Sequence, residues 1–243
     1  MKNNGKILIV AVTILIVTAM LIHSYENRYA NSETINVTGL GKKDFKSDLI
    51  VWEANFSRKH IELKEAYKAL EEDRYLIKEY LITKGLKNDE ILFSSVDISK
   101  EYQTIYDKEG NSIEHKFIGN ILAQTIKLES QEIEKTESIA REITELINTG
   151  IELYSENPKY YYTKLSELKI EMIAEATNDA RLRAENIAQN SKAQLGNLKL
   201  ATMGIFQIVG QNSDEDYSWG GTFNTSSKMK TATVTLKADF KIN

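Results

Sequence analysis

Residues 168–188 read LKIEMIAEATNDARLRAENIA, and this stretch decides much of the fold. Small or apolar side chains recur at every fourth position, and side chains spaced in this way lie on one face of an α-helix. The members of this ridge are Leu168, Met172, Ala176, Ala180, Ala184 and Ala188. The ridge predicts a helix over residues 167–191. Because most of its members are alanine, the helix backbone can approach a neighbouring sheet or helix closely, and we expect Ala180 and Ala184 to be buried there.

Segments rich in β-branched and aromatic residues lie on both sides of this helix. They predict strands over residues 34–40, 48–57, 91–106, 113–128, 151–154, 160–165, 195–209 and 228–242. A helical period predicts two further helices, over residues 61–84 and 132–147. The order is therefore ββα, ββα, ββα, ββ. It predicts an α+β fold, in which helices pack on a mainly antiparallel sheet.

Two short patterns refine this prediction. In the second strand Ile50, Trp52, Ala54 and Phe56 alternate with more polar residues, which predicts that they share the buried face. Gly39-Leu40-Gly41, at the end of the first strand, predicts a turn. A phosphate-binding loop is disfavoured there, because no third glycine and no helix follow at the required spacing.

The strands 91–106 and 113–128 are joined by Asp107–Asn111, as in a hairpin. Strands of this length, at about 3.3 Å per residue, span roughly 50 Å, whereas a domain of this size has a radius of gyration of about 17 Å. We therefore expect the hairpin to project, with Tyr102 and Phe117 among the apolar residues of its shaft. Its unpaired backbone groups predict a homo-oligomer. The alternative is a helix folded over the shaft and a monomer.

Lys2 and Lys6 precede an apolar run over residues 7–22. At about 1.5 Å per residue the run spans roughly 24 Å, between the length of a signal-peptide core and that of a transmembrane helix. The basic flank indicates that the N-terminus stays in the cytoplasm. We expect residues 1–23 to be a signal anchor or signal peptide, residues 24–33 a tether, and residues 34–243 one domain outside the membrane. The protein is secreted if the segment is cleaved.

Composition narrows the chemistry. The 243 residues carry a formal net charge of −4, which disfavours binding to nucleic-acid phosphates. The chain has no cysteine, so it has no disulfide, thiolate nucleophile or cysteine metal ligand. His23, His60 and His115 form no metal-binding pair and are expected on the surface, and no nucleophile motif occurs. We expect no catalytic residue, no cofactor and no metal.

Two aromatic segments are candidate contact surfaces. Residues 210–221 read GQNSDEDYSWGG and predict a solvated loop that exposes Tyr217 and Trp219. Its three acids lack the spacing of a calcium loop. In a strand, Tyr161 faces away from Tyr160 and Tyr162, which suits sheet packing or, alternatively, stacking on a ligand or glycan. The candidate interaction surface comprises Tyr102, Phe117, Tyr161, Tyr217 and Trp219.

Two stretches of the chain resemble the SIMPL domain family. Residues 35–41, INVTGLG, and the following Ser47-Asp48 resemble the family's first strand, I-x-V-x-G-x-G, and a Pro-Asp pair. Residues 176–188, ATNDARLRAENIA, resemble its late helix, A-x-x-D-A-[KR]-x-[KR]-A-E-x-[LI]-A, and Leu195-Gly196 resembles the start of the next strand. Two positions depart from the pattern: Ser47 replaces proline, and Lys192 replaces the glycine that closes the helix.

The resemblance implies an exported or envelope-associated protein without a shared catalytic residue. Some members of the family self-assemble, and some are linked to stress defence. We therefore expect a non-catalytic protein of the cell envelope that associates with itself. One alternative is a binding module for a small ligand or surface polymer, suggested by residues 160–162 and the loop around Trp219. A second is a hydrolase that uses a pair of carboxylates. A cleft with convergent polar groups would favour either alternative, and an exposed edge strand would favour assembly.

Overall fold

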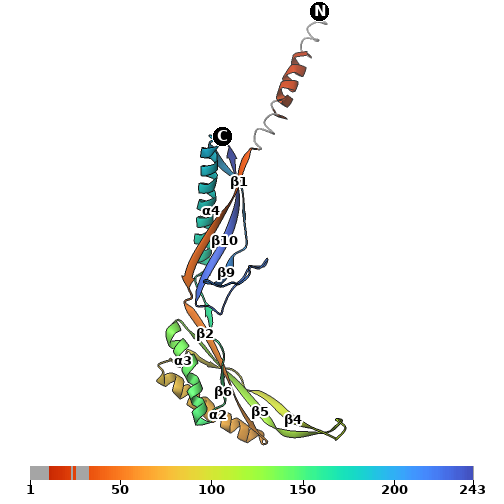
Figure 1. Ribbon diagram of the computed structural model, residues 1–243, viewed down its shortest axis with the longest axis vertical. Coiled ribbons are helices and arrows are strands. Elements are labelled where there is room, and N and C mark those ends of the chain that lie inside the picture. The colour runs from red at the N-terminus through yellow and green to blue at the C-terminus, as the bar shows by residue number, and fades with distance from the viewer. Residues whose placement is uncertain (1–10, 23, 26–32, 243) are drawn as a thin grey trace, which may run out of the picture.

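The computed structural model describes residues 11–22, 24–25 and 33–242. It has an α+β fold with antiparallel sheets (Figure 1). The elements of residues 33–242 are β1 (Thr34–Lys46), β2 (Leu49–His60), α2 (Leu63–Thr83), β3 (Ile91–Phe93), β4 (Asp97–Tyr106), β5 (Ser112–Ser130), α3 (Ile133–Glu142), the 3-10 helix η1 (Ile143–Thr149), β6 (Leu153–Ser155), β7 (Lys159–Tyr161), α4 (Leu165–Asn190), β8 (Leu195–Met203), β9 (Gln207–Gly210) and β10 (Met229–Ile242).

The strands form two sheets in two lobes that lie end to end (Figure 1). In the first lobe β10 pairs with β1, β8 and β9, and α4 covers the sheet. We call it the terminal lobe, because it contains both ends of residues 33–242. In the second, β5 pairs with β2, β3 and β4, while β6 and β7 pair with β2. We call this the inserted lobe, because the chain builds it between β1 and α4. Each lobe has its own hydrophobic core.

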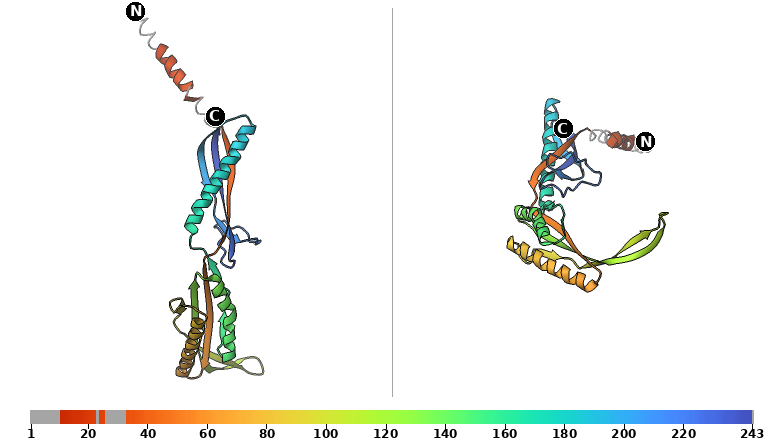
Figure 2. Two further views of the ribbon diagram at one scale, coloured as in Figure 1. Left: turned by 90° about the vertical axis from the view of Figure 1, so that its left-hand side faces the viewer. Right: turned by 60° about the horizontal axis from the view of Figure 1, so that its bottom comes forward.

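The terminal lobe is built on a close contact between α4 and β1 (Figure 2). All six residues of the predicted ridge are buried, including Ala180 and Ala184, which confirms the expectation. Gly39 and Gly41 lie within β1 on the side that faces α4. A Cβ atom at Gly39 would lie 2.1 Å from the carbonyl oxygen of Ala176. The predicted turn at Gly39-Leu40-Gly41 is therefore wrong: the glycines continue the strand and let the helix backbone approach.

The inserted lobe has large side chains in its core. Ile50, Trp52, Ala54 and Phe56 of β2 are fully buried on one face, as predicted. The helices α2 and α3 pack on this face and contribute Leu70, Ile77, Leu81 and Ile139. Asp73 of α2 is also buried, and Arg58 of β2 donates to both of its carboxylate oxygens. This two-bonded ion pair satisfies the buried charge and joins helix to sheet.

Several predicted elements have different boundaries. The strand expected over residues 91–106 is broken into β3 and β4, because the pairing register with β5 shifts by one residue between them, and the hydroxyl of Ser94 accepts a hydrogen bond from the N–H of Thr125. The strand over residues 195–209 is likewise divided into β8 and β9. The helix expected to reach Ile147 changes to the 3-10 form at Ile143. The strand expected over residues 160–165 ends at Tyr161, and α4 begins at Leu165.

The predicted apolar segment over residues 7–22 begins outside the described residues. Residues 11–22 are helical, and so are residues 24–25 of the expected tether. Among the described residues there is no helix with both the length and the apolar character needed to cross a membrane.

The lobes are joined by hydrogen bonds where the chain passes from one to the other. Asp48 accepts hydrogen bonds from the backbone N–H and the hydroxyl of Thr163, at 2.7 and 2.8 Å. The backbone N–H of Ser47 donates to the carbonyl oxygen of Lys228 at 2.9 Å. A proline at position 47 has no N–H and could not form this bond. The departure from the family pattern at Ser47 therefore coincides with a backbone hydrogen bond between neighbouring segments.

Candidate functional site

The first candidate site is the hairpin of β4 and β5, which projects from the inserted lobe (Figures 1 and 2). We call residues 97–119 the arm. β2 pairs with β5 only as far as Asn120, so residues 112–119 have β4 as their single neighbouring strand among the described residues. The outer edge of β4 is likewise unpaired within the described chain. The arm is thus a two-stranded ribbon with open edges, and its projection agrees with the sequence prediction.

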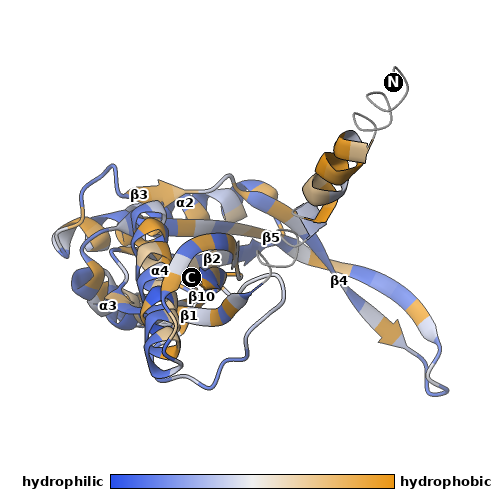
Figure 3. Cartoon of the chain, turned by 90° about the horizontal axis from the view of Figure 1, so that it is seen from above, coloured by the Kyte–Doolittle hydropathy of each residue, from blue (hydrophilic) through white to orange (hydrophobic). Residues whose placement is uncertain are grey.

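Apolar side chains are exposed along the arm. In Figure 3 the ribbon of the arm accordingly carries stretches in the orange of hydrophobic residues. Tyr102 is 52% exposed, and its ring meets the edge of Phe117 with 5.7 Å between ring centroids. Ile98 and Tyr106 lie on the same face of β4 as Tyr102, because they are separated from it by even numbers of residues. Both are exposed. The face that they share is an exposed apolar surface, and such surfaces favour contact with a partner.

Local backbone features determine the conformation of the arm at its root and at its tip. At the root Gly119 has φ +152°, a conformation that side chains rarely adopt, and the pairing register shifts next to it, between Glu101 and Tyr102. A glycine and a bulge are the usual means of bending a ribbon. At the tip the carboxylate of Asp107 accepts hydrogen bonds from the backbone N–H groups of Asn111 and Glu109, each at 2.8 Å. These bonds, that of Asn111 first, hold the pKa of Asp107 below its usual value.

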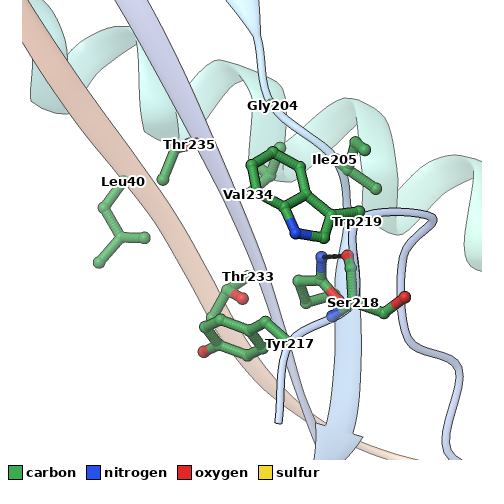
Figure 4. Close-up of a pocket in the computed structure, with 10 residues that line it drawn as sticks. Leu40, Gly204, Ile205, Tyr217, Ser218, Trp219, Thr233, Val234 and Thr235 are labelled. Carbon is green, nitrogen blue, oxygen red and sulfur yellow. Dashed lines mark hydrogen bonds between the residues drawn. The ribbon is translucent and has the colours of Figure 1, made fainter.

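The second candidate site is a hollow on the face of the terminal sheet opposite α4 (Figure 4). Its volume is about 470 Å³. Strands β1 and β10 supply its floor through Leu40, Thr233 and Thr235, and the segment between β8 and β9 supplies Ile205. The loop between β9 and β10, residues 211–228, supplies Tyr217 and Trp219 at its rim (Figure 4). We call residues 211–228 the Trp219 loop.

Buried polar side chains hold the Trp219 loop in place. The amide of Gln207 accepts hydrogen bonds from the backbone N–H groups of Ser218 and Thr222 and donates to the carbonyl oxygen of Ser218. The carboxylate of Glu215 accepts hydrogen bonds from the N–H of Gly210 and from the side chain of Asn224. The side chains of Gln207 and Glu215 thus form hydrogen bonds with the loop backbone and hold the loop in one conformation. They therefore fix the position of Trp219 without a bound partner.

Lys230 lies beneath this loop with no exposed surface. Its ammonium donates to the carbonyl oxygen of Asn224 at 2.7 Å and to the side-chain oxygen of the same residue at 3.2 Å. Burial lowers the pKa of Lys230 to about 8, although the nearby carboxylate of Glu215 acts in the opposite direction. A charge is costly in such a place, so Lys230 ties the loop to β10 at the expense of stability near neutral pH.

The SIMPL family model, described as a protein of unknown function (DUF541), matches residues 35–240. The chain belongs to the SIMPL family. No curated protein matches it. The matched range includes both stretches that carried the resemblance, and in this SIMPL chain they meet in space: Gly39 and Gly41 of the first stretch lie against Met172, Ala176 and Ala180 of α4. The family pattern therefore describes the contact between helix and strand in the terminal lobe.

The five predicted interaction residues lie in three places on this SIMPL chain. Tyr102 and Phe117 are on the arm, and Tyr217 and Trp219 line the hollow. Tyr161 lies in β7 near the junction of the lobes, 6.5 Å from Phe223 between ring centroids. Sequence reasoning did not find Leu40, Ile205, Thr233 or Thr235, because they come from β1, from β10 and from the segment between β8 and β9. The alternation over residues 231–236 could have identified the two threonines as neighbours on one face.

The residues around Tyr161 favour the packing interpretation of residues 160–162. Tyr160 donates its hydroxyl to Glu137 at 2.8 Å, and burial raises the pKa of Tyr160 to about 12. Tyr162 packs on Phe45 with ring centroids 4.8 Å apart. Each of the three rings is partly buried. They join the lobes rather than form an open stacking platform.

The remaining polar candidates do not assemble into a centre. His60 and His115 are exposed, as predicted, and His23 lies outside the described residues. Across residues 11–22, 24–25 and 33–242, no group of three His, Asp or Glu side chains is placed to hold a metal ion. Of the three acids in the Trp219 loop, Glu215 is already engaged by Gly210 and Asn224.

Proposed function

We propose that this SIMPL protein is a non-catalytic protein of the cell envelope that assembles with copies of itself through the arm. The observation that carries the proposal is the open outer edge of β4, on a ribbon that extends beyond the body. An exposed strand edge presents N–H and C=O groups that a second strand can pair. The apolar face beside that edge adds side-chain burial to the backbone bonds.

One register of two β4 strands pairs this apolar face with itself. If two copies meet antiparallel with Tyr102 opposite Tyr102 of the second copy, then Ile98 lies opposite Tyr106 twice. Facing residues of antiparallel strands lie on the same side of the sheet, so these apolar side chains would be neighbours. Lys100 then faces Thr104, and Glu101 faces Gln103. No like charges face one another between residues 98 and 106 in this register.

The proposed location rests on the N-terminal sequence. Lys2 and Lys6 before the apolar run 7–22 support a single-pass anchor with its N-terminus inside and the domain outside. The start of β1 and the end of β10 are paired at the end of the molecule farthest from the inserted lobe (Figure 1). An anchor before β1 would therefore leave the arm free to meet neighbouring copies. Protease added to intact, wall-stripped cells should digest residues 31–243, and complete protection would contradict this location.

A role in stress defence follows only from the family resemblance, and no residue described above carries it. Loss of the gene should then sensitise cells to envelope or oxidative stress. Equal survival of deleted and complemented cells would leave assembly as the whole proposal.

Sedimentation of the full chain in a mild detergent tests assembly. We expect an oligomer at micromolar concentration, and a monomer after Tyr102→Lys and Phe117→Lys are combined, because two charges would have to be buried. The matched control combines Tyr75→Lys and Tyr154→Lys, two exposed tyrosines outside the arm that leave the net charge change the same. A monomeric wild type, or an oligomer that both double variants share, would sink the proposal.

Cross-linking tests the register. The chain has no cysteine, so a single introduced cysteine reports unambiguously. Tyr102→Cys should form a disulfide-linked dimer under mild oxidation, because opposed Cβ atoms on facing residues lie within disulfide reach. Gln103→Cys points to the other face and, in this register, does not oppose itself. Equal cross-linking of both variants would contradict pairing about Tyr102.

A further inference from the structure

Trp219 is the most exposed large hydrophobic side chain of the terminal lobe, at 96%. Its ring adds almost nothing to the core, yet the loop that carries it is fixed by three buried polar residues, Gln207, Asn224 and Lys230. A rigid loop that holds an aromatic ring in solvent reduces the entropy cost of binding. Tyr217 lines the same hollow from the same loop (Figure 4). The two rings therefore form a prearranged aromatic contact over the hollow.

The lining of the hollow is electrically neutral. No Asp, Glu, Lys, Arg or His is among the described residues that line it. The nearest acid along β1, Asp44, is occupied by hydrogen bonds from Gln211 and Thr231. A charged ligand would lose hydration in the hollow without gaining an opposite charge. The hollow therefore suits a neutral ligand.

Unused hydrogen-bonding groups lie beside the aromatic rings. Within the described part of the chain, no side-chain hydrogen bond occupies the hydroxyls of Thr233, Thr235 and Tyr217 or the indole N–H of Trp219. A wholly apolar ligand would remove water from these groups and return no hydrogen bond. A sugar ring has an apolar face of C–H groups that packs on an aromatic ring, and hydroxyls at its edge. It satisfies both kinds of group at once.

We propose that the hollow binds a neutral glycan, with one sugar ring packed on Trp219 and Tyr217 and its hydroxyls paired with Thr233 and Thr235. The volume, about 470 Å³, lies in the range of about 300–1,000 Å³ that is usual for ligand pockets and suits a short stretch of glycan. Gly204 closes the floor, since a Cβ atom there would lie 2.4 Å from the hydroxyl oxygen of Thr235. The site is in the terminal lobe, so it is independent of pairing through the arm.

Fluorescence titration of the full chain in mild detergent tests the site. The probes are three neutral trisaccharides: triacetylchitotriose, cellotriose and maltotriose. Trp52 is fully buried in the other lobe, so a saturable change in tryptophan emission reports on Trp219. At least one probe should bind. Calorimetry with that probe should show affinity at least tenfold weaker for Trp219→Ala, and severalfold weaker for Thr235→Val, which keeps the shape of the side chain but removes its hydroxyl.

The control is Tyr154→Ala, which removes an exposed tyrosine of the inserted lobe and should bind as the wild type does. Circular dichroism melts confirm that each variant is folded. Three results would each overturn the proposal: no saturable binding of any trisaccharide, equal affinity in the wild type and Trp219→Ala, or an emission change that depends on protein concentration alone. The last result would assign the hollow to contact with a second copy.

Discussion

Both lobes pack a helix on an antiparallel sheet, but the terminal lobe uses small residues at this contact and the inserted lobe uses large ones. In the terminal lobe Ala176, Ala180 and Ala184 of α4 meet Gly39 and Gly41 of β1, so that the two backbones nearly touch. In the inserted lobe Trp52 and Phe56 fill the space between β2 and its helices. The contact in the terminal lobe requires small side chains, so that the helix and strand backbones can approach. The contact in the inserted lobe requires large side chains that fill the space between helix and sheet.

This difference decides how each lobe responds to substitution. Side chains in a filled core lose both transfer free energy and contacts when they are shortened. A close backbone contact loses little when shortened, because it has little to lose, but it is forced apart by added atoms. Both lobes also bury polar groups, such as Lys230 in the terminal lobe and Asp73 in the inserted lobe, so polar burial does not distinguish them. We therefore expect large-to-small substitutions to destabilise the inserted lobe most, and small-to-large substitutions to destabilise the terminal lobe most.

The largest effect is expected from Phe56→Ala in the inserted lobe. Phe56 is fully buried, and its ring meets the edge of Phe93 with centroids 6.3 Å apart. Removing it should lower the free energy of unfolding by about 3–5 kcal/mol. Urea unfolding followed by tryptophan fluorescence measures this loss, in a Trp219→Phe background that leaves Trp52 as the single reporter. A loss below about 1 kcal/mol would mean that neighbouring side chains move into the space left by the ring. It would contradict the claim that the inserted lobe depends on large side chains.

The second effect is overpacking of the terminal lobe. Ala180→Leu should cost about 1–3 kcal/mol, and Gly39→Ala should cost a similar amount, although it adds one carbon atom, because its Cβ would lie 2.5 Å from the backbone nitrogen of Ala180. Thermal and urea unfolding measure both. Ala174→Leu is the matched control on the exposed side of α4 and should change stability by less than about 0.5 kcal/mol. Equal stability of Ala180→Leu and Ala174→Leu would refute the close contact.

Sequence patterns predicted what depends on a single element. The spacing of Leu168 to Ala188 gave the helix and its buried ridge, and the alternation of Ile50 to Phe56 gave the buried face of β2. The length of the hairpin gave the projecting arm. In each case a periodic set of side chains is enough, because one face must be buried or one ribbon must outgrow the body.

Features that depend on two distant segments were missed. The pattern Gly39-Leu40-Gly41 is the same in a turn as in a strand beneath a helix, and only the position of α4 distinguishes them. The break at Ser94 depends on Gln124, whose side chain donates to the carbonyl of Ser94 from a strand thirty residues away. The hollow combines β1, β10 and two loops, so no local pattern contains it. Tyr217 and Trp219 were identified as exposed, but not the floor beneath them.

The third effect is the pH dependence of stability that Lys230 confers. Below pH 8 the lysine is charged in both states, and folding carries the cost of burying an ammonium. Between the folded pKa of about 8 and the ordinary value of 10.5, the unfolded state binds more protons than the folded state, so stability rises with pH. Relative to Lys230→Met, the wild type should gain about 1–2 kcal/mol across this window. Urea unfolding at pH 7 to 10 measures the difference. Parallel profiles would show that the ammonium is not desolvated.

The smallest effect concerns the end of α4, where Lys192 replaces the glycine of the SIMPL pattern. Lys192 has φ 59°, and the N–H groups of Lys192 and Ala193 donate to the carbonyl oxygens of Gln189 and Ala188. This is the bonding of a glycine-closed helix end, but with a Cβ atom in the left-handed conformation. Lys192→Gly should therefore raise the free energy of unfolding by about 0.5–1 kcal/mol.

A positive charge near the last carbonyls of a helix is itself favourable, so the glycine variant also loses a small stabilising contribution. Lys192→Ala separates the two effects, because it removes the charge and keeps the Cβ atom. We expect Lys192→Ala to match the wild type or fall slightly below it, while Lys192→Gly exceeds both in urea unfolding. A gain shared by both variants would assign the effect to charge rather than backbone strain. The alanines of α4 have small side chains that make few contacts. We therefore expect the closing turn of α4 to contribute more to the stability of the terminal lobe than an equivalent turn would contribute to that of the inserted lobe.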